Sequence, residues 1–233
     1  MRTDPTSPDE RSEILALIPA YNEAERIVPV IQGAMEHLPV LVVDDGSRDA
    51  TSQLALDCGA EVLRLEPNQG KGAALKAGFR RAVEQGFKAV VTLDADGQHD
   101  TAEIPVFLHA WETKGSDMII GVRDFSKMPF PRRYSNPVGQ WLFNWAVGRF
   151  VPDNQSGYRL FSRRLMEASL DSPVGGFEFE VEIIVICIQH GYSLSGVPIR
   201  TIYAGEGSHI TPVRHVGRYF RLIWRTRKSM QAK

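Results

Sequence analysis

Short apolar runs that end in polar clusters recur along this chain, and they limit it to a small set of folds. Residues 14–18, 40–43 and 89–93 are largely apolar runs without polar alternation. Such runs are typical of strands that are buried on both faces of a parallel sheet. Helical patterns follow them at 24–37, 51–58, 70–85 and 101–113. This order predicts an α/β fold whose sheet is mostly parallel, doubly wound and covered by helices on both faces.

The length and composition favour one domain. The chain has 233 residues, of which 43% are hydrophobic, and this is enough to bury a substantial core. The first residues are rich in Asp, Glu, Ser and Pro, which predicts a disordered lead-in. No linker rich in Gly, Ser or Pro follows, although the rhythm of the elements changes from about Arg132. The expected parts are a lead-in 1–13, one domain 14–210 with halves 14–125 and 126–210, and a C-terminal tail 211–233.

Charge is unevenly distributed along the chain. The formal net charge is −1, but the last acidic residue is Glu206, and only basic charges follow it. The chain is therefore expected to have a mildly acidic body and a basic amphipathic tail. Cys58 and Cys187 lie in apolar helical surroundings, which is typical of small buried side chains in a reducing compartment. No apolar stretch approaches the roughly 20 residues of a membrane span, so a soluble or peripheral protein is expected.

Polar side chains follow three of the expected strands. The clusters are Pro-Ala-Tyr-Asn-Glu at 19–23, Asp-Asp-Gly-Ser at 44–47 and Asp-Ala-Asp-Gly-Gln at 94–98. In open α/β sheets, ligands bind outside the carboxyl ends of the strands. Tyr21 can offer its ring to a base or ribose, while Glu23 and Asp45 can accept hydrogen bonds from either. Each residue alone could equally cap a turn, but the recurrence at three strand ends favours a ligand site.

The third cluster has the composition of a metal site. A turn at Gly97 would let the oxygens of Asp94, Asp96 and Gln98 converge on one point. Oxygen ligands suit Mg²⁺ or Mn²⁺, which keeps open positions for substrate phosphates. The alternative is a loop whose aspartates only cap the next helix.

Asn68-Gln69-Gly70-Lys71-Gly72 opens another expected helix. It lacks the spacing and ending of a Walker loop. Lys71 and the helix amides are candidates for contact with donor phosphates, and a purely structural helix start is the alternative.

Five motifs follow one another along the chain: those at 19–23, 42–47, 68–72 and 94–99, and Gln-Ser-Gly-Tyr-Arg at 155–159. They stand in the order seen in family 2 inverting glycosyltransferases. The chain resembles the short dolichyl-phosphate or polyprenyl-phosphate mannose synthases over roughly residues 14 to 215. The resemblance implies a GT-A catalytic domain, a nucleotide-diphosphate sugar donor and a Mg²⁺ or Mn²⁺ ion.

The resemblance also implies roles for individual positions. Asp94, Asp96 and Gln98 would hold the metal, and Ala95 would lie beside the ribose. The family's remaining phosphate-contacting Arg and Lys fall here on Tyr203 and His209, which leaves donor and acceptor identity open. The nucleoside would be held by Pro19, Tyr21, Glu23, Val43 and Asp45. The lipid phosphate would be gripped by Arg123, Arg132 and, because the alignment can slip by one, Arg133.

The expected mechanism follows from charge. The metal at Asp96 would stabilise the leaving diphosphate, which is where such sites gain most of their rate. A lipid monophosphate is largely ionised at pH 7, because its second pKa is about 6, and needs no strong base. A hydroxyl acceptor needs one, and Asp153 is the best-placed candidate, although it could instead cap the turn after it. Gln155, Ser156 and Arg159 are expected to orient the sugar or acceptor, and Glu178, Glu180 and Glu182 either face the site or are solvated.

The C-terminal segment 218–228 mixes aromatic and basic residues. It could lie in a membrane interface, dock onto a membrane subunit or pack on the core. Nucleic acid is not an expected partner, because no stacking module or reading helix accompanies the charges.

The sequence thus favours a peripheral enzyme at the cytoplasmic face of a membrane. It would transfer a hexose such as mannose, with inversion, to a polyprenyl or dolichyl phosphate. The alternatives are transfer to a saccharide or protein hydroxyl, and a non-catalytic nucleotide-sugar binding module.

Overall fold

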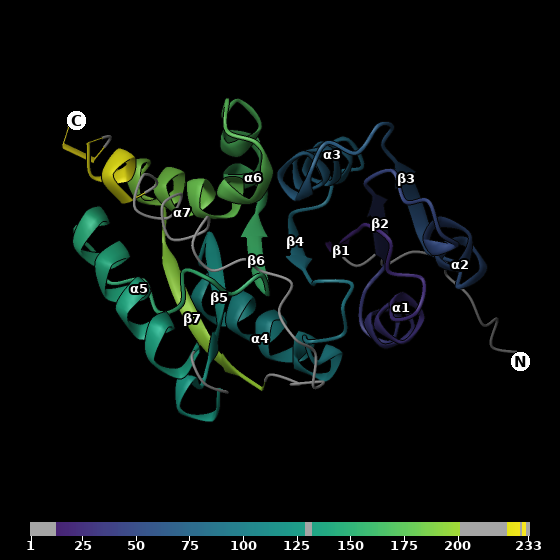
Figure 1. The fold of residues 1–233 in the computed structure, drawn as a ribbon, viewed down its shortest axis with the longest axis horizontal. Helices are drawn as coiled ribbons and strands as arrows, with labels where there is room; N and C mark the ends of the chain where they lie inside the picture. The colour runs from purple at the N-terminus through teal and green to yellow at the C-terminus, as the bar shows by residue number, and fades with distance from the viewer. Residues whose placement is uncertain (1–12, 129–131, 201–222, 229, 232–233) are drawn as a thin grey trace, which may run out of the picture.

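The computed structural model describes residues 13–128, 132–200, 223–228 and 230–231. Most of the expected lead-in and most of the tail lie outside these residues. The described strands form one sheet in the order β3-β2-β1-β4-β6-β5-β7 (Figure 1). The strands are β1 (Ile14–Ala20), β2 (Val40–Asp44), β3 (Glu61–Arg64), β4 (Ala89–Thr92), β5 (Met118–Arg123), β6 (Arg159–Ser162) and β7 (Leu194–Ile199).

One strand reverses direction within the described sheet. β1 pairs in parallel with β2 and β4, β2 with β3, and β5 with β7. β6 is inserted between β4 and β5 and is antiparallel to both. The prediction of a mostly parallel sheet is confirmed. The reversal was not predicted, because the apolar pattern of a strand carries no information about its direction.

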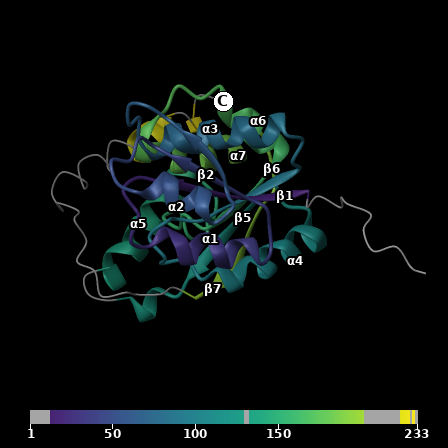
Figure 2. The ribbon, with the colours of Figure 1, turned by 90° about the vertical axis from the view of Figure 1, so that its right-hand side faces the viewer.

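Helices cover both faces of the sheet (Figure 2). Side chains alternate along β1, so that Leu15 and Leu17 join the cluster with α3, α5, α6 and α7. Ala16 and Ile18 join the cluster with α1, α2 and α4 on the other face. The helices are α1 (Ile27–Met35), α2 (Thr51–Asp57), α3 (Lys71–Glu84), α4 (Ile104–Lys114), α5 (Arg132–Val147), α6 (Arg163–Leu170) and α7 (Phe179–Gln189).

Two local predictions need correction. β1 continues through Pro19 to Ala20, where the sequence was expected to stop it at Pro19. The helix α6 was not predicted. It begins directly after β6, with Ser162 as its N-cap, and the Ser162 hydroxyl accepts a hydrogen bond from the Leu165 amide. A strand and a helix that share a boundary residue leave no loop signal between them.

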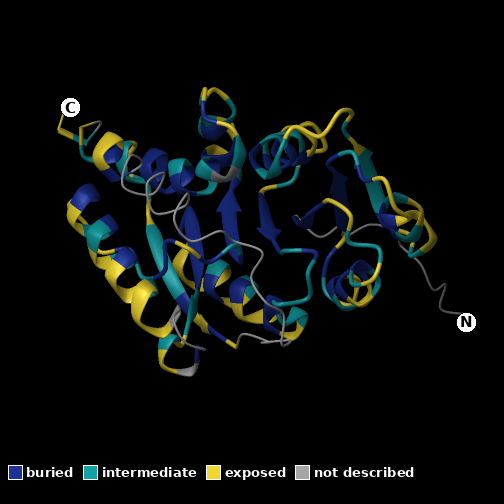
Figure 3. Ribbon diagram, viewed as in Figure 1, coloured by how far each residue is buried: buried dark blue, intermediate teal, exposed yellow. Residues whose placement is uncertain are grey.

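Burial follows the expected pattern (Figure 3). β1, β2 and β4 are buried along their whole length. Cys187 is buried, Cys58 is half-buried, and both are free thiols. Among the helices that the structure describes, none combines the length and the apolar character needed to cross a bilayer.

Candidate active site

The predicted polar clusters lie at one edge of the sheet. Ala20 is in register with Asp44, and Asp44 with Arg64, so β1, β2 and β3 end side by side. β4 ends beside β1, with the Leu93 amide donating to the Leu17 carbonyl. The loops after these strands therefore meet at their carboxyl ends, where an open α/β sheet binds its ligand.

A cavity of about 600 Å³ lies at the ends of β1, β2 and β3. Tyr21 lines it and is 44% exposed, so a ligand in the cavity can reach its side chain. Arg64 and Glu66 were not predicted for this site from the sequence, because their position depends on β3 lying beside β2. The lining residues are Tyr21, Gly46, Ser47, Arg48, Arg64, Glu66, Pro67 and Asn68.

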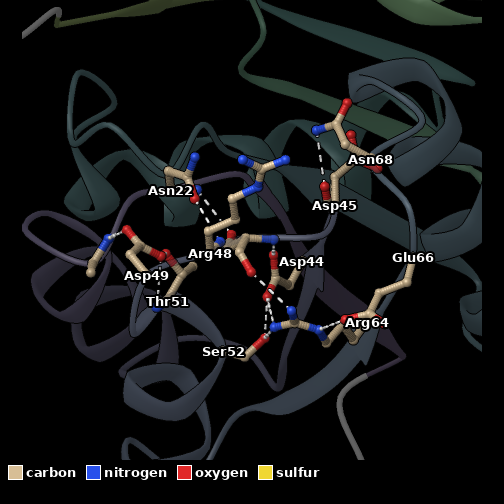
Figure 4. A network of polar contacts seen from close by, with 12 residues as sticks. Asn22, Asp44, Asp45, Arg48, Asp49, Thr51, Ser52, Arg64, Glu66 and Asn68 are labelled. Carbon is tan, nitrogen blue, oxygen red and sulfur yellow. Dashed lines mark hydrogen bonds and ion pairs between the residues drawn. The ribbon is translucent and has the colours of Figure 1, made fainter.

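A buried carboxylate organises the rim of this cavity (Figure 4). Asp44 is fully buried; one of its oxygens accepts from the Ser47 amide at 2.8 Å, and the other accepts from Arg64 Nη1 at 3.1 Å. Arg64 also donates to the Ser47 carbonyl at 2.8 Å. Asn22 links the neighbouring loop, because its amide donates to Ser47 Oγ and its side-chain oxygen accepts from the Arg48 amide. The rim of the cavity is therefore held together by hydrogen bonds within the protein.

Asp45 anchors the loop that begins α3. Its carboxylate accepts from the Gln69 amide at 2.8 Å and from the Gly70 amide at 2.6 Å. Gly70 has φ of 89°, a left-handed conformation that favours glycine. The predicted nucleoside contact of Asp45 stays a prediction, and its bonds in the structure hold Lys71 in place.

The other predicted nucleoside residues are placed in different ways. Pro19, Val43 and Ala95 are buried, and none of them is among the residues that line the cavity. Glu23 pairs with Arg26 at 2.8 Å. These four roles stay predictions as well.

Lys71 lies between two carboxylates. Its ammonium is 2.5 Å from Asp94 Oδ1 and 3.1 Å from Glu180 Oε1. Burial alone would raise the pKa of Asp94, but the positive charge of Lys71 lowers it to about 2. Burial alone would lower the pKa of Lys71, but Asp94 and Glu180 raise it well above its usual range. The site thus contains an ammonium that is paired with two carboxylates.

The turn after Asp94 is held by an imidazole. His99 Nδ1 accepts from the Asp94 amide at 3.0 Å, and the ring stacks on Tyr158 at 4.9 Å between centroids. Burial lowers the pKa of His99, so the ring is neutral at pH 7 with its proton on Nε2. Gly97 has φ of 75° and makes the turn that the sequence required.

The capping alternative can be compared directly with the structure. Asp100 is the residue that caps the following helix, accepting from the Ala102 amide at 3.0 Å. Asp96 accepts only from the Gln98 amide within its own turn. Neither Asp94 nor Asp96 is therefore the helix cap.

The donor set fits an open Mg²⁺ or Mn²⁺ site. Asp94, Asp96 and Gln98 supply only oxygen ligands from the protein, as these hard cations prefer. In the described part of the chain, no three His, Cys, Asp or Glu side chains converge in metal-binding geometry. Two carboxylates and an amide would leave coordination positions for the diphosphate.

The loop before β6 lies directly against Asp94. A Cβ built on Gly157 would be 2.8 Å from Asp94 Oδ2, closer than real Cβ contacts come. Ser156, predicted to orient the sugar or acceptor, is 1% exposed, and its hydroxyl has no hydrogen-bond partner within the described structure. Gln155 is exposed in the same loop.

Asp153 and Arg123 form a buried, two-bonded ion pair. Arg123 Nε donates to Asp153 Oδ2 at 2.8 Å, and Arg123 Nη2 donates to Oδ1 at 3.0 Å. The Asp153 side chain is 1% exposed, and Oδ1 also accepts from the Gln155 amide. Both carboxylate oxygens are occupied, which is the geometry of a residue that positions Arg123.

Arg159, predicted to contact sugar or acceptor, is 1% exposed. It donates to the Glu180 carbonyl at 2.6 Å and to the Asn154 carbonyl at 3.0 Å, while its Nε has no partner in the described structure. Burial lowers its pKa. Arg159 therefore joins β6 to α7 and to the loop before β6.

The remaining predicted residues do not all lie at the site. Arg133 is exposed on α5. Glu180 joins the site through Lys71, whereas Glu182 pairs with Arg225 at 3.3 Å. The side chain of Arg132, and the residues Tyr203 and His209, lie outside the described part of the chain.

This sheet and site define a GT-A nucleotide-sugar transferase fold. The chain belongs to glycosyl transferase family 2, whose model matches residues 16–171. It is 35% identical to glycosyltransferase AglJ of Haloferax volcanii over 93% of this chain and 72% of that protein. It is 31% identical to polyprenol monophosphomannose synthase of Mycolicibacterium smegmatis, over 84% of this chain and 80% of the relative.

Solved structures show the same fold. Glucosyl-3-phosphoglycerate synthase from Mycobacterium tuberculosis superposes with a TM-score of 0.71 at 20% identity, covering 93% of this chain and 79% of that chain. Another structure of that protein contains Mn²⁺ and uridine diphosphate. At this identity the likeness establishes the fold.

Proposed function

We propose that this glycosyltransferase moves a hexose such as mannose, with inversion, from a nucleotide-diphosphate sugar to a polyprenyl phosphate. The observation that carries the proposal is the convergence of the nucleoside-sized cavity, the Asp94–Asp96 turn and the Arg123–Asp153 pair at one edge of the sheet. Relatives named for polyprenol and undecaprenyl phosphate acceptors, at 31% identity, support this acceptor class. Residues 14–210 would form the catalytic domain, with the donor bound by 14–125 and the acceptor by 126–210.

Different residues would bind the nucleoside, the diphosphate and the metal ion. The nucleoside stacks on Tyr21, and the diphosphate extends toward Asp94 and Lys71. A bound divalent cation at Asp94, Asp96 and Gln98 would supply electrostatic stabilisation of the leaving diphosphate. Lys71 adds a second positive charge at the same place and requires no proton transfer.

Arg123 supplies the charge that receives the acceptor. Asp153 holds its guanidinium in a fixed orientation, so that its remaining N–H groups can meet a phosphate. An ionised phosphate attacks without a general base, which agrees with an Asp153 whose oxygens are both occupied. Peripheral binding at the cytoplasmic face would bring the enzyme to this acceptor.

The test is transfer of labelled sugar to a short polyprenyl phosphate in the presence of Mn²⁺. Asp96→Ala should lower kcat/KM by at least about a hundredfold, because it removes a metal ligand that acts in the transition state. The matched control is Asp100→Ala, which removes a nearby helix cap and should leave transfer within a few-fold of wild type. Full activity of Asp96→Ala with unchanged Mn²⁺ binding would contradict the assignment of Asp96 as a metal ligand. Transfer only to sugar hydroxyls would favour the alternative acceptor.

A further inference from the structure

The helix α5 exposes a row of large apolar side chains. Tyr134, Val138, Trp141 and Trp145 are 64%, 58%, 66% and 47% exposed. They are spaced by four, three and four residues, so they lie along one narrow stripe of the helix. In Figure 3 much of the outer side of α5, at the edge of the molecule, has the colour of exposed residues. Soluble surfaces rarely carry such a contiguous row without a binding role.

This stripe is not the packing face of the helix. The opposite side of α5 packs into the core through Phe143, Ala146 and Val147, which are at most 4% exposed. Phe150, directly after the helix, is 71% exposed and lines a hollow of about 530 Å³ beside Trp141. We call Tyr134, Val138, Trp141, Trp145 and Phe150 the α5 surface.

The segment of the chain that contains the α5 surface carries charge of one sign. Between Asp124 and Asp153 the sequence contains no acidic residue, and the side chains of Arg133 and Arg149 are exposed there. A second copy of this chain would bring these cations against each other. A layer of anionic lipid complements them, since each Lys or Arg near it adds about fivefold in binding.

The C-terminal segment is attached to the same surface. Arg227 lies over the ring of Trp145, 4.6 Å from its centroid, and donates to the Trp145 carbonyl at 2.8 Å. Nearby in the chain, Trp224 is 71% exposed and Lys228 is exposed. The segment thus adds another exposed aromatic ring and further positive charge next to α5.

We propose that the α5 surface is a bilayer-docking face, which inserts Tyr134, Trp141, Trp145 and Phe150 into the interfacial layer of an anionic membrane. Trp and Tyr favour this layer because one end of each ring system is apolar and the other is polar. This proposal adds a membrane-binding surface to the proposed function. Its link to the lipid phosphate acceptor rests on that function. Lipid insertion itself requires no turnover.

The geometry connects docking to the acceptor side. Gln140 of α5 donates to the Val151 carbonyl at 3.0 Å, and Asn144 accepts from the Val151 amide at 2.9 Å. Two residues later, Asp153 holds Arg123. A membrane that orients α5 therefore also orients the arginine assigned to the lipid phosphate.

The experiment is co-sedimentation of the full chain with vesicles of phosphatidylcholine and phosphatidylglycerol, three to one. Trp141→Ala should weaken partitioning about tenfold, and Trp141→Glu should abolish it. Arg149→Gln should weaken it about fivefold at low salt and less at high salt. The matched control is Leu56→Glu, which places the same charge at a 53% exposed apolar position on α2 and should bind like wild type.

The outcomes separate the two proposals. Equal binding of wild type and Trp141→Glu, or an equal loss in Leu56→Glu, overturns the docking face. A dimer that Trp141→Glu dissociates, without vesicle binding by wild type, assigns the α5 surface to a second copy and also overturns it. Transfer to a short, water-soluble isoprenyl phosphate without vesicles should be unchanged in Trp141→Glu. If wild type transfers nothing to any lipid phosphate but still binds vesicles as described, the acceptor assignment fails and the docking face stands.

Discussion

Gly157 leaves the carboxylate of Asp94 the space that it needs. A methyl group at this position would lie 2.8 Å from one carboxylate oxygen of Asp94 and 3.2 Å from the other. The carboxylate would have to shift, which would disturb its ion pair with Lys71 at 2.5 Å. A single added carbon atom at residue 157 would therefore affect the carboxylate of Asp94, which is far away in the sequence.

We expect Gly157→Ala to lower kcat/KM by about tenfold or more, since small displacements of a metal ligand are costly in the transition state. The measurement is steady-state transfer together with Mn²⁺ titration by calorimetry. Gly175→Ala is the control, because a Cβ there meets nothing within 4 Å. Normal Mn²⁺ affinity and turnover in Gly157→Ala would contradict this account of the loop.

Residue chemistry predicted part of the site and missed the rest for a physical reason. The types and spacing of Asp94, Asp96 and Gln98 indicated an oxygen-lined turn, and the structure places that turn where strand ends meet. The contact of Gly157 with Asp94 and the ion pair of Asp153 with Arg123 depend on tertiary packing, which no local pattern encodes. Arg64 and Glu66 were missed because they enter the site only through the order of the strands.

At the scale of elements, one carboxylate ties three strands together at the edge opposite the site. Asp117 precedes β5, and its oxygens accept from the Ser162 hydroxyl at the end of β6 and from the Ser193 amide before β7, each at 2.9 Å. Arg164 of α6 donates to it as well, at 2.5 Å. Burial alone would raise the pKa of Asp117, but the hydrogen bonds from Arg164 and Ser193 hold it well below the usual value of 3.8.

Asp117→Asn should therefore destabilise the fold by about 2–4 kcal/mol at pH 7, because a buried, multiply bonded charge is lost. A depressed carboxylate pKa contributes stability above the unfolded pKa and loses it as pH falls below about 3.8. The difference in the free energy of unfolding between wild type and Asp117→Asn should then become smaller as the pH is lowered from 6 to 3. Urea unfolding at both pH values measures it, with the exposed Asp171→Asn as control. A difference that stays constant with pH would exclude the ionised carboxylate as its source.

The elements themselves were predicted with uneven success. Strands buried on both faces, such as β1 and β2, were evident because their runs are continuously apolar. The direction of β6 and the existence of α6 were not evident, since β6 has only four residues and α6 follows without a break. Short elements are defined by their neighbours more than by their own composition.

At the scale of the whole molecule, donor binding should stabilise the chain through mass action. A nucleoside diphosphate with Mn²⁺ at about 100 times its Kd should add about 2.7 kcal/mol, which corresponds to a rise of about 5–10 °C in Tm. Thermal unfolding with uridine, guanosine and adenosine diphosphates would also identify the preferred base. Asp94→Asn should lose the Mn²⁺-dependent part of the rise, while Asp171→Asn should keep it. An undiminished rise in Asp94→Asn would place the cation elsewhere.

The reversed strand β6 connects the two edges of the sheet through a short stretch of chain. Its first residue, Arg159, adjoins the loop that contacts Asp94, and its last residue, Ser162, is bonded to Asp117. Four residues of extended chain span only about 13 Å. One extended segment thus joins the edge of the sheet at Asp94 to the opposite edge at Asp117, so the distance between the two edges is fixed. A one-residue insertion in β6 would turn the side chains at one of its ends to the other face of the sheet.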